Sequence, residues 1–357
     1  MKKPNCAVPC WTRRIVSVLV IVPFFGLAPT AQTADRRLSG AAAALVQSFD
    51  LSNLGGVIVA GQQNPDFTAE ETDERRVNLP LGPSGTVGLE NLSGNVSITA
   101  GNGPDVEIHI VKRSRGRTGA DAAQGLADVE VEVDQRGERA TIETHYPSGD
   151  ESPYSVSVSF EIAAPSGTHF TVETIAGNVT AEGLAGALSL STVAGNVTIR
   201  DARRVDRAHT VAGSVRLTNV VADGTLEAES VSGNITATEV TADRLLLHTV
   251  TGNLVARDVT AASAEMGTMT GSVEFTGAVA AGGRYELQSQ SGTVTFTASG
   301  GAGFELRANT FSGSIRPASN LGLEQPSEPR TALRGTVGDG SATVELTTFS
   351  GDVIISR

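Results

Sequence analysis

The side chains best suited to chemistry in this sequence are its five histidines. They are His109, His145, His169, His209 and His248. Two of them, His209 and His248, stand four residues before a recurring glycine, but two repeats apart, which is roughly 9–10 Å at the spacing of stacked strands. One metal ion cannot be held across that distance. We therefore expect solvated strand histidines and no metal centre.

Carboxylates are the second candidate chemistry, because glycan-cleaving enzymes need them paired on one face. Here the acids are spread over successive repeats, in the turn that follows the second strand of each. They are Glu182, Asp201, Asp223, Glu239 and Asp258. We expect this acidic edge to aid solubility and to discourage edge-to-edge association.

A local basic turn lies within this acidic edge. It contains Arg200, Arg203, Arg204 and Arg207, interleaved with Asp201 and Asp206. The interleaved signs favour a solvated corner over an anion site.

Other chemical signatures are missing from the sequence. There is no His-Glu-x-x-His, no Gly-x-Ser-x-Gly and no Gly-Gly-x-Gly-x-Asp motif. The two cysteines, Cys6 and Cys10, both precede the first apolar segment. The sequence therefore predicts a protein that is not an enzyme and that uses no cofactor.

A repeated glycine is the main organising feature. From residue 177 to residue 313 it recurs every 18 to 21 residues, within blocks such as Thr-Val-Ala-Gly-Asn-Val and Thr-Phe-Ser-Gly-Ser-Ile. An earlier relative and a later one complete the set. The repeat glycines are Gly94, Gly177, Gly195, Gly213, Gly233, Gly252, Gly271, Gly292, Gly313 and Gly351. A period near 20 indicates stacked supersecondary units, and we expect each glycine where the chain bends or approaches a neighbour too closely for a side chain.

Each repeat predicts two short strands. One apolar set lies seven and five residues before the glycine, as in Leu188 and Leu190; the other lies two before, two after and four after, as in Val193, Val197 and Ile199. The two sets are out of phase by one residue, which predicts a corner near the intervening Thr or Ser. In this registry the residue two before the glycine is buried. The alternative is the opposite registry, with the Thr buried and that residue exposed.

Asparagine and threonine recur one and three residues after the glycine, as in Asn178 and Thr180. The pairs resemble the flat polar array of ice-binding solenoids. Arg216, Glu274 and Arg316 interrupt the array, so we do not expect ice binding.

The N-terminus predicts export. Lys2, Lys3, Arg13 and Arg14 precede an apolar run over residues 15–28, and small residues follow. This pattern is typical of a signal peptide over residues 1–34, and an uncleaved membrane anchor is the alternative. Without those four basic residues, 23 Lys and Arg face 39 acidic residues, a net charge of about −16, which argues against nucleic acid or anionic lipid as a partner.

Three further segments complete the domain prediction. Residues 35–80 lack any sustained period and predict a flexible or disordered linker. Residues 81–357 predict the solenoid, with a short helix near 118–127 that has Thr118 as N-cap and Asp121 in its first turn. Prolines at 317, 326 and 329 predict a loop insertion at about 317–342.

The Thr-Val-Ser-Gly-Asn-Val-like blocks behind a signal peptide resemble the "putative adhesin" family of exported bacterial β-strand-repeat domains of unknown function. The resemblance covers roughly residues 85–357 and implies an all-β fold, a single-stranded right-handed β-helix, or β-solenoid. It carries no binding residues with it, since the repeated residues are folding residues.

Three functions fit these features. The first is an exported cell-envelope protein, in the periplasm, on the cell surface or secreted, that presents polar faces to a protein or glycan partner. The second is a structural protein that assembles end to end. The third is a polysaccharide-cleaving β-helix enzyme.

Overall fold

The computed structural model describes residues 66–147, 152–321 and 331–357. These residues belong to one unit of the chain, and the other unit, residues 1–57 and 148–151, lies outside the described residues. The predicted signal peptide also lies outside them, as does the predicted linker up to residue 65.

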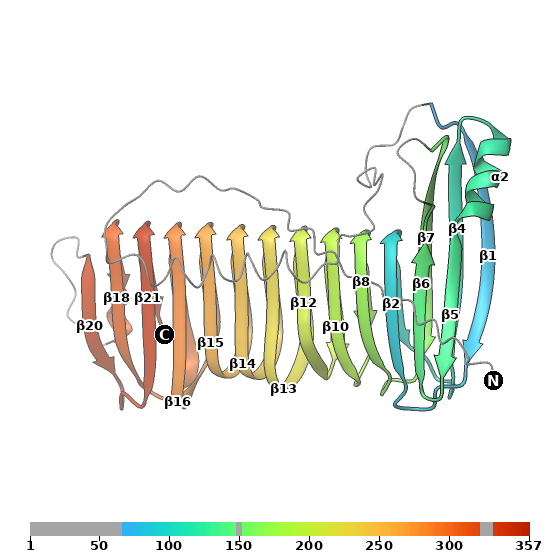
Figure 1. The fold of residues 1–357 in the computed structure, drawn as a ribbon. Helices are drawn as coiled ribbons and strands as arrows, with labels where there is room; N and C mark the ends of the chain where they lie inside the picture. The colour runs from blue at the N-terminus through green and yellow to red at the C-terminus, as the bar shows by residue number, and fades with distance from the viewer. Residues whose placement is uncertain (1–65, 148–151, 322–330) are drawn as a thin grey trace, which may run out of the picture. The chain divides into compact units, whose positions relative to one another are not determined.

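Parallel pairing joins the repeats into a stack of rungs (Figure 1). Each rung has a strand before its glycine, on the first face of the stack, and a strand after it, on the second face. The early rungs comprise β2 (Thr86–Ser93) with β3 (Val96–Ala100), β8 (His169–Ala176) with β9 (Val179–Glu182), β10 (Ala187–Ala194) with β11 (Val197–Ala202), and β12 (Arg204–Ala212). Pairing runs from β2 through β8 and β10 to β12 on one face and from β3 through β9 to β11 on the other. The predicted all-β, solenoid-like architecture is confirmed.

In the middle of the stack, single strands run from one glycine corner to the next. They are β13 (Val215–Ser232), β14 (Ile235–Thr251), β15 (Leu254–Thr270) and β16 (Val273–Ser291). The prediction of two short strands per repeat is therefore wrong here. The second bend is made six residues after the glycine, where Asn219, Glu239 and Asp258 have φ values of 52°, 56° and 53°. One left-handed residue turns the chain while pairing continues on both sides of it.

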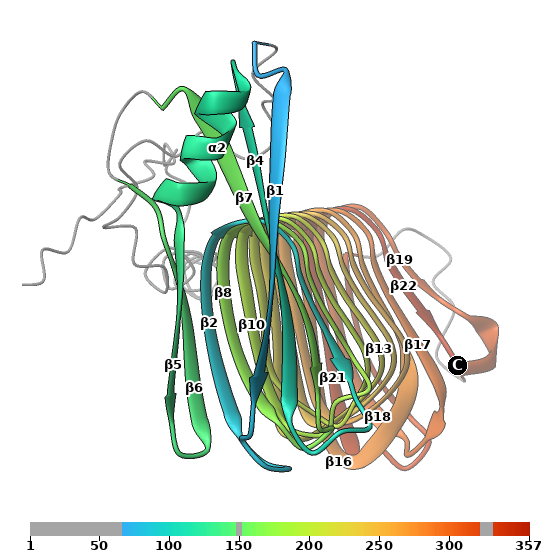
Figure 2. The same ribbon diagram turned by 90° about the vertical axis from the view of Figure 1, so that its right-hand side faces the viewer.

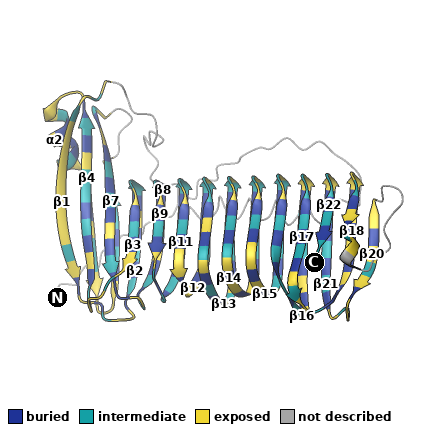
Figure 3. Ribbon diagram, turned by 180° about the vertical axis from the view of Figure 1, so that it is seen from behind, coloured by how far each residue is buried: buried dark blue, intermediate teal, exposed yellow. Residues whose placement is uncertain are grey.

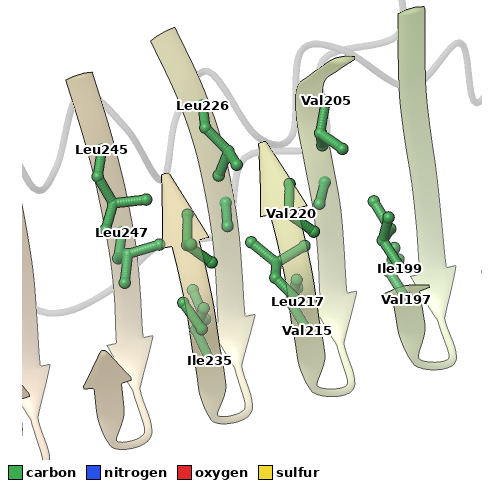
Figure 4. Close-up of a cluster of buried hydrophobic side chains, with 14 of the residues drawn as sticks. Val197, Ile199, Val205, Val215, Leu217, Val220, Leu226, Ile235, Leu245 and Leu247 are labelled. Atoms are coloured by element: carbon green, nitrogen blue, oxygen red, sulfur yellow. The ribbon is translucent and has the colours of Figure 1, made fainter. Parts of the chain in front are cut away.

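The core is a set of apolar columns that run along the inside of the stack. Buried residues alternate with less buried ones along most strands of the stack (Figure 3), as one covered face requires. Val197, Ile199 and Leu217 are fully buried and point toward the residues of neighbouring rungs (Figure 4). Toward the C-terminal end the core becomes aromatic, and the rings of Phe275 and Phe296 stack with centroids 5.4 Å apart.

Antiparallel strands close the N-terminal end of the stack. On the second face, β3 pairs with β7 (Tyr154–Ala164), β7 with β4 (Val106–Gly116), and β4 with β1 (Ala69–Leu79). On the first face, β2 pairs with β6 (Arg139–His145) and β6 with β5 (Glu130–Arg136). In the end view, β5 and β6 stand to one side of the stack, while β1 runs across the front of it (Figure 2). Because β1 spans residues 69–79, that part of the predicted linker is a strand, held by eleven register pairs with β4.

The only helix among the described residues other than a short 3-10 turn is α2 (Gly119–Asp128), which packs against β4 and β1. It begins as the sequence predicts. Thr118 is the N-cap, and its side chain accepts a hydrogen bond from the backbone of Asp121, whose carboxylate accepts one from the backbone N–H of Thr118. This reciprocal capping box satisfies two donors at the helix start.

The last rungs do not stack in sequence order. The final rung, β21 (Ala342–Ser350) with β22 (Val353–Ser356), lies between the rung of β16 and β17 (Val294–Gly301) and the rung of β18 (Phe304–Ser312) and β19 (Ile315–Pro317). The predicted loop at 317–342 contains η2 (Ser319–Leu321) and β20 (Ala332–Val337). Strand β20 pairs antiparallel with β18 and covers the first face of the outermost rung.

Candidate functional site

An inner column of hydroxyls corrects the predicted registry. In the eight rungs from Gly195 onward, the Thr or Ser three residues before the glycine is buried, as Thr192, Thr210 and Thr249 are. Each of these eight hydroxyls donates to the glycine carbonyl of the neighbouring rung, at 3.0 Å from Thr192 to Gly177 and 3.0 Å from Thr249 to Gly233, whereas the buried hydroxyl of Thr174 has no such partner among the described residues. A hydrogen bond of this kind offsets the cost of removing a hydroxyl from water. The preferred registry, with the residue two before the glycine buried, is therefore wrong, and its alternative holds.

The glycine column explains how rungs approach at this corner. A Cβ placed on Gly195 would lie 2.0 Å from the carbonyl oxygen of Gly177, and one on Gly252 would lie 2.0 Å from that of Gly233. No side chain fits at these separations. The same close approach, at 2.2 Å or less, holds at every repeat glycine, the carbonyl at Gly94 being that of Val158.

Where the residue after the glycine is Asn or Asp, its side chain forms a second polar contact between rungs. The side-chain oxygen of Asn178 accepts the backbone N–H of Asn196 at 2.9 Å, and Asn234 does the same for Asn253 at 2.8 Å. Asp352 continues the pattern by accepting from the N–H of Ser314. The recurring asparagine therefore joins rungs together, and its carbonyl oxygen is already engaged by the fold.

The residues two before each glycine form the outer apolar stripe on the first face. All lie on the outside of the stack and are half-buried or exposed. In stacking order they are Leu92, Ile175, Val193, Val211, Val231, Val250 and Met269, followed by Gln290, Phe349 and Phe311. The last two are the exposed large hydrophobic side chains of the described residues, at 47% and 73%. Exposed apolar patches of this kind mark interaction sites.

A polar column runs beside this stripe, four residues before each glycine. Register places His209 beside Glu229, and Glu229 beside His248. Burial, with the nearby positive charge of Arg207, lowers the pKa of His209 to about 4. Burial and the adjacent Glu227 raise the pKa of Glu229 to about 7. Both groups therefore favour their neutral forms near pH 6.

These shifts correct the prediction of solvated histidines at two positions. His209 is 1% exposed, and burial also lowers the pKa of His248. Each ring is flanked along the column by register partners in adjacent rungs, which enclose it. The other histidines lie elsewhere: His109 contacts Glu74 and Glu161 across the cap strands.

The charged turns have structural roles of their own. Asp201 occupies a left-handed corner with φ of 52° and accepts a hydrogen bond from Asn219 in the next rung. Arg207, in the predicted basic turn, pairs with Glu227 at 2.8 Å. Of the acids of the predicted edge, Asp201, Glu239 and Asp258 occupy left-handed corners of the chain. Within the described ranges no three His, Cys, Asp or Glu side chains gather as a metal site would need. No helix of the described chain is long and apolar enough to cross a bilayer.

Sequence reasoning missed the outer apolar stripe because apolar residues were assigned to the core. A signal was present at one repeat. Gln290 occupies the stripe position, and an amide there fits poorly with burial. The position before it is Thr or Ser in all eight rungs from Gly195 onward in the stack, which fits a fixed hydrogen-bonding role.

Comparison with known proteins gives a family and two distant structures. Residues 158–356 match the family model described as Toastrack DUF4097, and curated proteins give no match. A "putative cell adhesion protein" from Clostridium sporogenes is 10% identical, with 81% of this chain and 99% of that chain covered and a TM-score of 0.20. A "putative adhesin" from Bacteroides fragilis is also 10% identical, with 80% and 97% covered and a TM-score of 0.37.

Likenesses this distant carry no functional argument. The family match is different in kind, because it spans more than half of the sequence and covers the repeats from β7 to the last strand. It confirms the family resemblance carried by the glycine-centred blocks. This chain belongs to the Toastrack DUF4097 family.

Proposed function

We propose that this chain is an exported, non-enzymatic binding module of the bacterial cell envelope. In this proposal the first face of the stack adheres to a protein or glycan partner. The observation that carries it is the outer apolar stripe, in which seven successive rungs from Leu92 to Met269 present an outward apolar side chain beside a polar column. A repeated line of contacts suits an extended partner, since each rung adds an equivalent contact.

Export rests on the basic start, apolar run and small residues over 1–34. The periplasm, the cell surface and the medium all fit it. A net charge of about −16 after signal removal disfavours nucleic acid and anionic lipid surfaces. We propose further that the chain winds as a single-stranded, right-handed coil, the hand preferred by parallel crossover connections.

End-to-end assembly is less well supported than side-face binding. The N-terminal end exposes β1, whose residues 70–76 are six charged residues and one threonine. It also exposes β5, with Glu130, Glu132 and Asp134. Charged antiparallel edge strands discourage the addition of further strands. A head-to-tail polymer would need this end to accept a parallel rung.

The test is binding of the mature chain, residues 35–357, to purified peptidoglycan sacculi and to an array of bacterial surface glycans and envelope proteins. The chain with Val231→Asp and Val250→Asp carries two charges in the stripe, and Thr236→Asp on the second face is the matched control. We expect the stripe variant to lose binding at least 10-fold and the control to bind like the wild type. Equal binding by both variants would refute a role for the first face.

A further inference from the structure

We propose that the outermost rung at the C-terminal end, residues 310–316, is a docking edge for one extended peptide strand of another polypeptide. We call these residues the C-terminal docking edge. The proposal goes beyond the binding role of the first face, because it concerns the end of the stack and holds whether or not the side faces bind anything.

The backbone of this rung has two donors that face away from the stack. In the inner rungs the glycine N–H donates outward to the next rung, as from Gly351 to the carbonyl of Ser312 at 2.9 Å. The N–H two residues later does the same, as from Val353 to Ser314 at 2.9 Å. Gly313 and Ile315 hold these positions in the outermost rung, and no described residue accepts from their N–H groups, because β19 pairs with β22 alone.

The carbonyl of Gly313 is also left without the contact that its counterparts make. Thr348 donates its hydroxyl to the carbonyl of Gly292, and Thr310 donates to that of Gly351, each at 2.9 Å. No hydroxyl of the described chain reaches Gly313. This glycine is exposed, whereas the other nine repeat glycines are half-buried.

A side-chain contact adjoins these backbone groups. The rings of Phe311 and Phe349 stack with centroids 4.7 Å apart and planes inclined by 5°. Phe349 belongs to the rung beneath, so one ring face of Phe311 is covered and the other is open, consistent with its 73% exposure. An apolar or aromatic side chain on an added strand would extend the stack by one ring.

The strands around the C-terminal docking edge leave room for one added peptide strand. Strand β20 covers Phe304–Asn309 on the first face and stops before Phe311. The described N-terminal end of a second copy does not match this edge, because its outermost described strands, β1 and β5, are charged and pair antiparallel with their neighbours. A free extended strand can, by the strand addition that exposed sheet edges support. The blocks nearest this end, those of Gly313 and Gly351, define the pattern that fits: Thr, Phe, Ser, Gly, a polar residue and an apolar residue.

The probe is a fluorescent synthetic peptide that copies residues 345–356, Glu-Leu-Thr-Thr-Phe-Ser-Gly-Asp-Val-Ile-Ile-Ser. It is titrated into the mature chain, residues 35–357, and into two variants. Phe311→Ser removes the open ring, and Val231→Ser removes a stripe residue in the middle of the stack. We expect saturable binding, at least 10-fold weaker for Phe311→Ser and unchanged for Val231→Ser.

Two N-methylated peptides test the backbone contacts. In the stacked rung the N–H of Val353 points outward, and the alternation of a parallel strand points that of Ile354 inward. A methyl on the peptide nitrogen matching Ile354 should abolish binding, and one on the nitrogen matching Val353 should not. Bound peptide should also slow hydrogen exchange at Gly313 and Ile315.

Binding that ignores the position of the methyl group would overturn the proposal, and so would exchange at Gly313 and Ile315 that the peptide leaves unchanged. A dimer that protects these amides without peptide would also overturn it, by assigning the edge to a second copy. None of these three results bears on the binding of sacculi or glycans by the first face.

Discussion

The hydroxyl of Thr192 donates a 3.0 Å hydrogen bond to the carbonyl oxygen of Gly177 in the adjoining rung. The two residues are 15 apart in sequence, and the same contact recurs from Thr210 to Gly195 and from Thr268 to Gly252. The next rung needs glycine at this position, because a Cβ on Gly195 would lie 2.0 Å from the carbonyl oxygen of Gly177. The buried hydroxyls and the repeat glycines thus stabilise the same corner of the stack together.

Removing one hydroxyl should leave a buried carbonyl without its partner. Thr192→Val keeps the shape of the side chain, and we expect it to lower the free energy of unfolding by about 1–2 kcal/mol. Val193→Thr, on the adjacent outward position, should change it by less than about 0.5 kcal/mol. Urea unfolding of the two variants measures both. Equal effects would mean that the hydroxyl does not stabilise the corner.

Adding a methyl group at one of the repeat glycines should lower the free energy of unfolding by more than the loss of one hydroxyl does. The Cβ of Gly252→Ala would lie 2.0 Å from the carbonyl oxygen of Gly233, so the rungs must separate. We expect a loss of about 3 kcal/mol or more. Gly119→Ala is the control, since nothing lies within 4 Å of its Cβ and it sits in α2, where alanine is the better helix former. A mild Gly252→Ala variant would contradict the close approach.

The pKa of Glu229, raised to about 7 from 4.5 by burial and by Glu227, gives stability a pH dependence. Between these values the folded protein holds a proton that the unfolded chain has lost, so this contribution is full below about pH 4.5 and falls as pH rises to 7. The difference in unfolding free energy between wild type and Glu229→Gln should therefore decrease by about 1–3 kcal/mol over that window.

Urea unfolding at pH 4.5 and 7.5 gives this difference. Glu305→Gln, on an exposed position of β18, is the control and should show no such trend. His209 has the opposite effect on the pH dependence of stability. Its pKa is lowered to about 4 from 6.5, so its contribution to the free energy of unfolding is lost as the pH falls through that range. A difference that rises with pH would show that Glu229 ionises readily in the folded protein.

The sequence predicts the stack well because its evidence is local and repeated. The spacing of the glycines predicts the rungs, and Thr118 with Asp121 predicts the start of α2. Registry is harder to predict, because the partner of Thr192 is a carbonyl in another rung and the alternation changes phase at the glycine. If that contact is not known, the more polar threonine is expected to be exposed and the neighbouring valine to be buried.

Two other features depend on contacts distant in sequence. The placement of β21 between β16 and β18 follows from pairing across 59 residues, as between Arg284 and Thr343, and across 38 residues, as between Phe304 and Ala342. Strand β1 lies in a charged segment whose sequence shows no apolar alternation and therefore does not predict a strand. Its pairing with β4 along the whole of its length holds it in the extended conformation. The outer apolar stripe, the candidate binding surface, could be recognised only once the registry was known.

The hydroxyl column holds the stack together from inside, while the neighbouring apolar column lies on the outside, where we propose that a partner binds. Urea unfolding with hydrogen exchange on Thr249→Asp and Val250→Asp tests this arrangement most directly. Thr249→Asp places a carboxylate in the core and should lower the free energy of unfolding by about 3 kcal/mol or more. Backbone amides of the flanking rungs should then exchange their hydrogens faster. Val250→Asp should cost less than about 1 kcal/mol. A destabilising Val250→Asp beside a mild Thr249→Asp would invert the registry and remove the stripe from the surface.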